Sequence, residues 1–469
     1  MNCNKYERIG LVLTFIATLT LTACGSAQVV TVEVPVTHPT IIFWSTETQP
    51  DRAEQTQAII ERFTGDTGIN VKLVLVDQTS MGTVMAANFA AGTLPDVVFM
   101  PVPLVGGWYA DGILDAVMAT VVIEALDKNT FAQGALKMVA VDAGFAAVPS
   151  DGWGQLLIYR ADLFKELGLE SPTDYDKIVA AAMALEKSGI TGIMAGTDPG
   201  HPHTQSTFEH FALANGVHLT DGVGNVTLNT PAMVTAIETY ANLMANYGPK
   251  DTATYWQQSR AAYLAGETGM ILWSPFVLDE LAGLRDSTFP NCSECGDDPG
   301  FIAKNSGFVP AFSGPDGGPA QFGKVNYMGI TTGADTESAR QFVEYWLSEG
   351  YLDWLGVAAE GKFPMRRGTS ENPTEYIDGW GQLEVGVDRR APLGDFYSAG
   401  ELEIIVQGAD NLTMLGIDEG ELELVTAIYE ELVFPRAIGD VIEGVLTPEG
   451  AAQQIQMEVE EIQAVLKSE

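Results

Sequence analysis

Tryptophans and small polar residues stand directly after two apolar runs that have the character of buried strands. Trp44 ends the first run and is followed by Thr46 and Glu47. Trp273 ends the second run and is followed by Ser274. A tryptophan ring offers a flat apolar surface, and a hydroxyl or carboxylate beside it offers a fixed hydrogen-bonding group. This combination suits a small molecule with apolar C–H faces and an edge of hydroxyl groups, such as a sugar.

Each candidate also has a structural alternative. Trp44 fits a core tryptophan equally well, and Glu47 has the character of a solvated acid at the start of a helix. Asp96 follows Pro95 in front of a third apolar run, where it fits either a cap that positions the strand or a ligand contact. Residue type alone therefore nominates these positions and leaves the alternatives open.

Metal-dependent and catalytic chemistry have less support in the residues. His201 and His203 form a His-x-His pair in a Gly/Pro-rich loop, with His210 further on, but no cysteine or carboxylate set accompanies them. We therefore expect no metal there, and a hydrogen-bond donor is the better role for either histidine. No Gly-x-Ser-x-Gly nucleophile turn and no phosphate-binding loop is present. We expect a protein that is not an enzyme and that needs no cofactor.

Two cysteines form a Cys-x-x-Cys in the loop sequence PNCSECG, at Cys292 and Cys295. A zinc site would need two further ligands, and a redox motif would need a helix start in a thioredoxin-like unit. Outside the cytoplasm, a local disulfide between Cys292 and Cys295 is the expected state.

The N-terminus has the pattern of a secretory signal. Lys5 and Arg8 precede an apolar run over residues 9–23, which is shorter than the roughly 20 residues of a spanning helix. The run ends in LTACGS, which resembles a bacterial lipobox, with Cys24 as the lipidated residue. We predict a signal peptide over residues 1–23, a tether over residues 24–39, and an extracytoplasmic protein anchored by lipid to the outer face of the cell membrane or in the periplasm.

The whole chain is strongly acidic, with 62 Asp and Glu against 24 Lys and Arg and a formal net charge of −38. The acids are spread along the chain, which indicates a solvated surface. Such a charge keeps a protein soluble and disfavours nucleic acid as a partner.

Behind the tether, the hydrophobic pattern alternates between strand and helix. We expect strands at residues 41–44, 71–76 and 95–100, and helices at residues 51–63 and 81–91. This order predicts an α/β fold with a parallel sheet, and ligands bind outside the carboxyl ends of such strands. About 445 residues exceed one comfortable core, so we expect two domains.

Six segments stand in a fixed order along the chain: residues 63–71 (FTGDTGINV), 88–98 (NFAAGTLPDVV), 147–155, 159–164, 262–270 and 361–366. Together they resemble the extracellular solute-binding proteins of group 1, the sugar-binding subunits of ABC importers. Each motif is weak alone, but their order behind a lipobox is specific. The resemblance implies two α/β lobes joined by a hinge, with a ligand cleft between them. By analogy, lobe 1 is residues 40–149 plus about 307–348, and lobe 2 is about 150–306 plus 349–469.

The resemblance also implies where ligand contacts should come. Asp151 and Trp153 flank Gly152 where the chain should first cross between the lobes, Tyr327 lies near the proposed return crossing, and Arg366 follows the late segment. For Arg366 a surface salt bridge is an equal alternative.

The implied function is that of an ABC importer subunit which captures a carbohydrate, acts as a monomer and delivers the ligand to membrane permease subunits. A cationic solute such as a polyamine suits an acidic, aromatic cleft as an alternative ligand. A sensor protein would share this fold and site. A glycoside hydrolase would need two carboxylates about 5–10 Å apart. Because acidic residues are abundant in this chain, their presence alone does not indicate such a catalytic pair.

Overall fold

The structure, a computed structural model, describes residues 39–78, 80–142, 144–250 and 253–468 of the chain. The predicted signal peptide, Cys24 and nearly all of the predicted tether lie outside these residues. Within the described ranges, no helix combines the length and the hydropathy that crossing a bilayer requires.

A seven-stranded sheet forms the first half of the molecule and reaches into its centre, in the order β11-β6-β10-β3-β1-β2 with β14 beside β10. Its parallel part pairs β1 with both β2 and β3, while β10 runs antiparallel to β3 and β6. The strands are β1 (Thr40–Ser45), β2 (Asn70–Leu75), β3 (Val97–Pro101), β6 (Val148–Gly154), β10 (Gln321–Ile330), β11 (Phe363–Pro364) and β14 (Leu412–Thr413).

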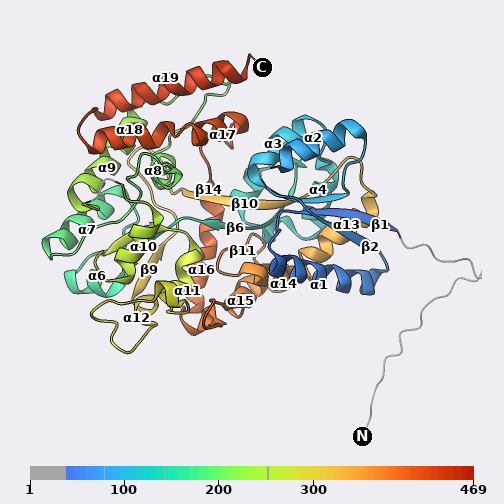
Figure 1. The fold of residues 1–469 in the computed structure, drawn as a ribbon, viewed down its shortest axis with the longest axis horizontal. Helices are drawn as coiled ribbons and strands as arrows, with labels where there is room; N and C mark the ends of the chain where they lie inside the picture. Colours follow the sequence, from blue (N-terminus) through green and yellow to red (C-terminus); the bar gives the residue numbers. More distant parts are fainter. Residues whose placement is uncertain (1–38, 79, 143, 251–252, 469) are drawn as a thin grey trace, which may run out of the picture.

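A three-stranded sheet, β8-β7-β9, forms the second half. Its strands are β7 (Leu156–Arg160), β8 (Met270–Trp273) and β9 (Ser306–Val309). Only Gln155 separates β6 from β7, so the chain passes from the large sheet directly into the small one. Figure 1 shows β6 and β10 running between two bodies of helices. The predicted two-lobed α/β fold is thus confirmed.

Helix α1 shows how the sequence sets the local structure of the first lobe. It spans Pro50–Thr67, with proline in its first turn, and ends at Gly68, whose φ of 77° is the left-handed conformation that favours glycine. Ile59, Ile60 and Phe63 on its buried face join Phe43 of β1 in one hydrophobic cluster. Burial of each such side chain stabilises the fold by about 1.5–3 kcal/mol.

Other helices cover both sheets. They are α2 (Met81–Ala91), α3 (Val105–Ala110), α4 (Ala116–Ala125), α5 (Gln133–Lys137), α6 (Ala161–Leu167), α7 (Tyr175–Lys187), α8 (Pro202–Ala214), α9 (Pro231–Tyr247), α10 (Trp256–Leu264), α11 (Leu278–Leu281), α12 (Phe301–Lys304), α13 (Thr336–Trp346), α14 (Tyr351–Leu355), α15 (Glu375–Gly381), α16 (Ala399–Gln407), α17 (Leu422–Glu430), α18 (Val433–Ile442) and α19 (Pro448–Leu466). Helices α7, α8, α9, α18 and α19 share a second cluster with β7 and β8.

The late part of the chain contributes to both halves. Tyr351 and Trp354 of α14 are fully buried in the cluster that contains Phe43 of β1, whereas Ile438 and Ile455 of α18 and α19 are buried in the second cluster. The lobe boundaries given above remain a prediction, and this packing indicates that residues near 351–357 go with the first sheet.

Candidate ligand-binding site

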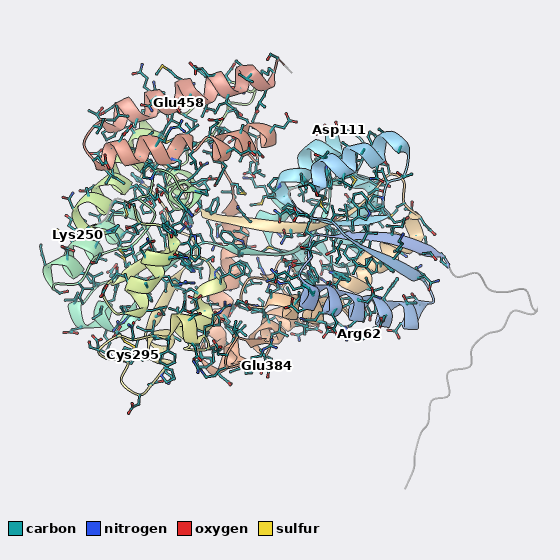
Figure 2. All side chains as sticks on the ribbon, viewed as in Figure 1. Arg62, Asp111, Lys250, Cys295, Glu384 and Glu458 are labelled. Carbon is teal, nitrogen blue, oxygen red and sulfur yellow. A yellow bond between two sulfur atoms is a disulfide. The ribbon has the colours of Figure 1, made fainter. Side chains whose placement is uncertain are left out.

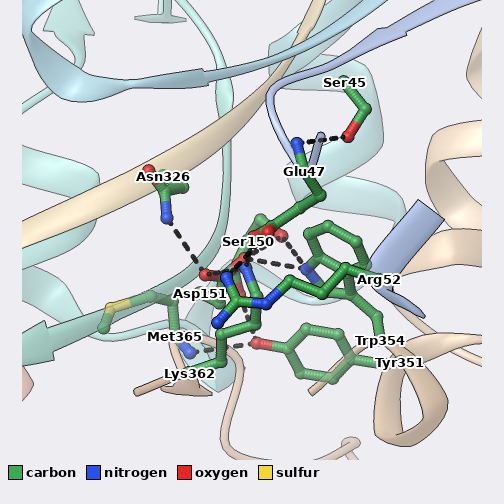
Figure 3. Close-up of polar contacts among 10 residues, drawn as sticks. All are labelled: Ser45, Glu47, Arg52, Ser150, Asp151, Asn326, Tyr351, Trp354, Lys362 and Met365. Atoms are coloured by element: carbon green, nitrogen blue, oxygen red, sulfur yellow. Dashed lines mark hydrogen bonds and ion pairs between the residues drawn. The ribbon is translucent and has the colours of Figure 1, made fainter. Parts of the chain in front are cut away.

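A cluster of buried charges lies where β1 ends beside the crossing strand β6 (Figure 3). Lys362 Nζ is 2.6 Å from Glu47 Oε1 and 3.2 Å from Asp151 Oδ1. The side chains of Lys362, Glu47 and Asp151 are 5 %, 11 % and 0 % exposed. Burying charges is costly unless they are paired, and the lysine between two carboxylates meets that condition.

Asp151 is held from several elements at once. Its Oδ2 accepts hydrogen bonds from Trp354 Nε1 at 2.7 Å and from Ser150 Oγ at 3.0 Å, and its Oδ1 accepts one from Asn326 Nδ2 at 3.1 Å. The β6–β10 register shifts at this point, and Ser150 is the extra residue of the resulting bulge. The bulge therefore lies directly beside the charge cluster.

Glu47 is held in its charged form. Burial raises the pKa of its carboxyl, but the Lys362 ammonium and the Arg52 guanidinium, 2.9 Å from Oε2, outweigh burial and lower that pKa below its ordinary value. With two cations beside two carboxylates, the cluster carries no excess charge.

Trp153 lies on the same sheet face as Asp151, two residues further along β6. In β10, Lys324 pairs with Trp153 and Asn326 pairs with Asp151. The half-buried Trp153 ring contacts Phe322 edge-on at 6.0 Å. One face of the crossing strands therefore carries an aromatic ring followed by the polar cluster.

The second lobe contributes a group of aromatic rings at its end of the crossing. Trp273, which pairs with Leu156 just after β6, has ring centroids 5.5 Å from His203 and 6.1 Å from Trp256. Tyr255 stacks on His201 at 4.8 Å and meets Trp256 at 6.0 Å. We call these five residues the aromatic cluster.

His203 is neutral in this setting. Burial, with a smaller contribution from His201, lowers its pKa to about 3. Its Nε2 is buried without a hydrogen-bond partner among the described residues. His201 Nδ1 accepts the backbone N–H of His203 at 3.0 Å, which leaves Nε2 of His201 as the nitrogen that carries a proton.

Phe276 links the aromatic cluster around Trp273 to the charge cluster around Lys362. It follows Trp273 by three positions, and a Cβ added at Gly361 would lie 1.9 Å from its ring. Gly361 directly precedes Lys362, so the loop after β8 packs against the residue beside the charge cluster. A larger residue at position 361 would force the Phe276 ring to move.

A groove of about 670 Å³ separates the helices of the two lobes. Pro103 and Leu104, in the turn after β3, line it together with Trp108, and Glu423 and Glu430 of α17 line it as well. The volume is typical of small-molecule sites. None of the residues of the charge cluster or of the aromatic cluster lines this groove.

The structure thus brings Glu47, Asp151 and Trp153 onto the crossing strands and their edge, and it places Trp273 and Ser274 at the facing end of the second sheet. Thr46 is half-buried beside Glu47, and Ser274 is half-buried beside Trp273. The other predicted contacts lie elsewhere.

Two predicted contacts prove to be packing residues. Trp44 is 6 % exposed and belongs to the hydrophobic core with Val98 and Met100 of β3. Tyr327 is fully buried, and its hydroxyl donates to the carbonyl of Ala135 at 2.8 Å. Tyr327 is thus used within the fold, and the Trp44 ring packs beside β3. Trp273 is buried to a similar degree, at 8 % exposed, but its neighbours are the rings of His203 and Trp256.

Two predicted polar contacts prove to be structural. Asp96 lies at the amino end of β3, where its carboxylate accepts the backbone N–H groups of Ile42 at 2.7 Å and Asp335 at 2.6 Å. Arg366 is 4 % exposed and donates to the carbonyls of Leu347 at 2.6 Å and Leu126 at 3.0 Å. The carboxylate and the guanidinium are thus used within the fold.

Sequence reasoning missed Lys362, Arg52, Trp354 and Asn326 as parts of the site. Lys362 lies in segment 361–366, next to a glycine, but a lone lysine gives no sign of burial. The pairing of Trp354 with Asp151 joins positions 203 residues apart, which no local pattern reveals.

The sulfur atoms of Cys292 and Cys295 are bonded to each other, with Cα atoms 5.1 Å apart. Figure 2 shows Cys295 at the outer edge of the second lobe, away from the crossing strands. Among the described residues, no group of three His, Cys, Asp or Glu side chains is arranged to hold a metal ion.

Two α/β lobes joined by crossing strands, with candidate binding residues where the strands cross, define the class of two-lobed solute-binding proteins. Residues 48–352 match the bacterial extracellular solute-binding protein family, and this chain belongs to that family as an ABC solute-binding protein. It is 25 % identical over 343 residues to the putative ABC transporter periplasmic-binding protein YcjN of Escherichia coli K12, which covers 71 % of this chain and 74 % of that protein.

Solved structures share the fold at low identity. The sugar-binding protein MalE of Xanthomonas citri has a TM-score of 0.70 at 18 % identity, over 91 % of this chain and 98 % of that one. The cyclic α-maltosyl-1,6-maltose binding protein of Arthrobacter globiformis has a TM-score of 0.66 at 16 % identity, over 92 % of this chain and 100 % of that one.

Proposed function

We propose that this protein captures a neutral carbohydrate between its lobes and delivers it to the membrane permease of an ABC importer. The rings of Trp153 from the crossing strand and of Trp273 from the second lobe stack on the apolar faces of the sugar. His203, Ser274 and Thr46 supply hydrogen-bonding groups at its hydroxyl edge.

The observation that carries the neutral assignment is the state of the charged groups. Glu47 and Asp151 are already paired with Lys362, and His203 is neutral. A cationic solute would need unpaired carboxylates at the site, and an anionic one would need a free arginine or lysine cluster. A neutral polyhydroxyl compound needs neither.

Several sugar-binding structures of the same fold are in accord with this proposal. The proteins in these structures are bound to maltose, acarbose, tagatose or ribitol, all of them neutral polyols or sugars apart from the amine of acarbose. At identities below 20 % these names support a ligand class for this chain and not a particular sugar.

The proposal includes a lipid-anchored monomer with Cys24 as the lipidated residue, attached through residues 24–39 on the outer side of the cell membrane or in the periplasm. In cell fractionation, the wild-type chain should stay with the membranes, and a Cys24→Ser chain should appear in the soluble fraction. Equal membrane association of both chains would contradict it.

Residues 25–469 should be screened by thermal shift against neutral mono- and oligosaccharides, sugar phosphates and polyamines. We expect stabilisation by one or a few neutral sugars, since a ligand that binds only the folded state raises Tm. Stabilisation by polyamines alone would overturn the carbohydrate assignment, and turnover of an oligosaccharide would favour a hydrolase instead.

A further inference from the structure

The surroundings of Lys362 have the composition of a cation-binding site. Its Nζ lies 4.3 Å from the centroid of the Trp354 ring and 5.0 Å from that of Phe99, in addition to the two carboxylates of Glu47 and Asp151. Aromatic faces together with carboxylates are what recognises an organic ammonium ion. We propose that Glu47, Asp151, Trp354 and Phe99 form a cage for a primary ammonium ion. The side chain of Lys362 fills this cage from within the chain and thereby keeps cationic solutes out of the neighbouring ligand site.

The cage is held in shape by groups other than Lys362. Trp354 is fixed by its hydrogen bond to Asp151, and Asp151 is fixed by Asn326 and Ser150. Glu47 is fixed through its second oxygen by Arg52. Removal of the lysine side chain therefore leaves both carboxylates and the Trp354 ring where they are.

The vacated cage would carry excess negative charge. Glu47 Oε1 would lose its one partner among the described residues, and Asp151 Oδ1 would keep only Asn326. Arg52 alone would then face two buried carboxylates. This imbalance favours the entry of one small cation over a neutral molecule of the same shape.

The cage borders the proposed sugar site. Lys362 precedes β11, which pairs with β6 along the stretch that leads to Trp153, and Gly361 packs against Phe276 of the second lobe. The effect on ligand selectivity rests on the proposed function, whereas the cage itself does not.

The test uses a Lys362→Ala variant of residues 25–469, whose missing atoms correspond to propylammonium. Tm of the variant should lie below that of the wild type and should rise by about 2 °C or more with propylammonium chloride. Equal concentrations of 1-propanol and of sodium chloride should not raise it. Wild type and Lys304→Ala, which removes an exposed lysine paired with Asp298, should show no response to propylammonium.

A response equal to that with 1-propanol would show simple cavity filling and would overturn the proposal, as would no response at all. If Lys362→Ala does not fold alone, recovery of its circular dichroism on refolding from urea with each additive gives the same comparison. Lys362→Met, which fills the cage without charge, should not respond to propylammonium, and a response would contradict the proposal.

Sugar binding by the wild type is measured separately. A wild-type protein that binds no neutral sugar overturns the proposed function and leaves the cage result standing. A variant that binds a sugar but ignores propylammonium overturns the cage and leaves the proposed function standing.

Discussion

Trp354 donates its indole N–H to Asp151 at 2.7 Å and so ties the core of the first lobe to the strand that crosses into the second. The same ring covers the Lys362 ammonium at 4.3 Å. Two roles thus meet in one side chain, because the indole satisfies a buried carboxylate and its face stabilises the cation paired with it.

Trp354→Phe should therefore be more costly than an ordinary tryptophan-to-phenylalanine change. A hydrogen bond to a buried charged group contributes about 1.5–3 kcal/mol, so we expect a loss of about 2 kcal/mol in the free energy of unfolding. Trp380→Phe is the matched control, since Trp380 is fully buried but donates to the neutral carbonyl of Ala359 at 2.8 Å. Equal losses in urea unfolding would contradict the special role of Asp151.

Tyr327→Phe should lower stability without affecting ligand affinity. The change removes one buried hydrogen bond to Ala135 and should cost about 1 kcal/mol. Affinity for the sugar should stay within twofold, because the ring lies in the core and not at the ligand. Titration calorimetry checks this, and a tenfold loss of affinity would restore Tyr327 as a contact.

Glu209 should make stability fall as pH rises. Burial raises its pKa from 4.5 to about 7, although Tyr429, the Leu415 amide and Lys324 all favour the charged form. The unfolded chain loses this proton near pH 4.5, whereas the folded chain keeps it to about pH 7. The stabilisation from this group is therefore complete below pH 4.5 and is lost between about pH 4.5 and pH 7.

Glu209→Gln removes this titration. Relative to wild type, the variant should gain about 3 kcal/mol in unfolding free energy between about pH 4.5 and pH 8. Urea unfolding at several pH values measures the difference. Glu337→Gln, which alters an exposed carboxylate whose pKa is lowered, serves as the control and should not show a gain. A constant difference for Glu209→Gln would contradict the raised pKa.

Binding should not depend on the ionisation of His203. With a pKa of about 3 the imidazole stays neutral in the folded state, so the sugar affinity should be flat between about pH 5 and pH 8. His203→Ala should weaken binding about tenfold through loss of one hydrogen bond. A step in wild-type affinity near pH 6.5 that disappears in His203→Ala would show instead that this histidine titrates.

The fold was predictable because its signals are local. The apolar runs and helical faces give β1, β2, α2 and β3 to within about two residues at each end. They also give the start of α1, which runs four residues beyond its predicted end at residue 63. The helix predicted over residues 81–91 matches α2, and the glycine that ends it has φ of 67°. Periodicity, proline and glycine each act over a few residues, so sequence order alone reveals them.

The site was predictable only in part, for the opposite reason. Trp153 and Trp273 could be nominated from the sequence because they stand at strand positions near the crossing, where strand geometry fixes the side of the sheet. Trp44 also stands at the end of a strand, but its ring packs beside β3 in the hydrophobic core. The sequence does not indicate which face of the strand the rest of the protein covers. The partners of Asp151 come from three distant segments, and tertiary packing alone brings them together.

Titration calorimetry of the sugar identified by screening, with wild type, Trp153→Ala, Trp273→Ala and Trp380→Phe, tests the interlobe binding of a sugar most directly. We expect each of the first two changes to weaken binding at least tenfold, because the crossing strand supplies one stacking ring and the second lobe the other, while Trp380→Phe leaves affinity unchanged. Wild-type affinity in both alanine variants would contradict a sugar held between these two tryptophans.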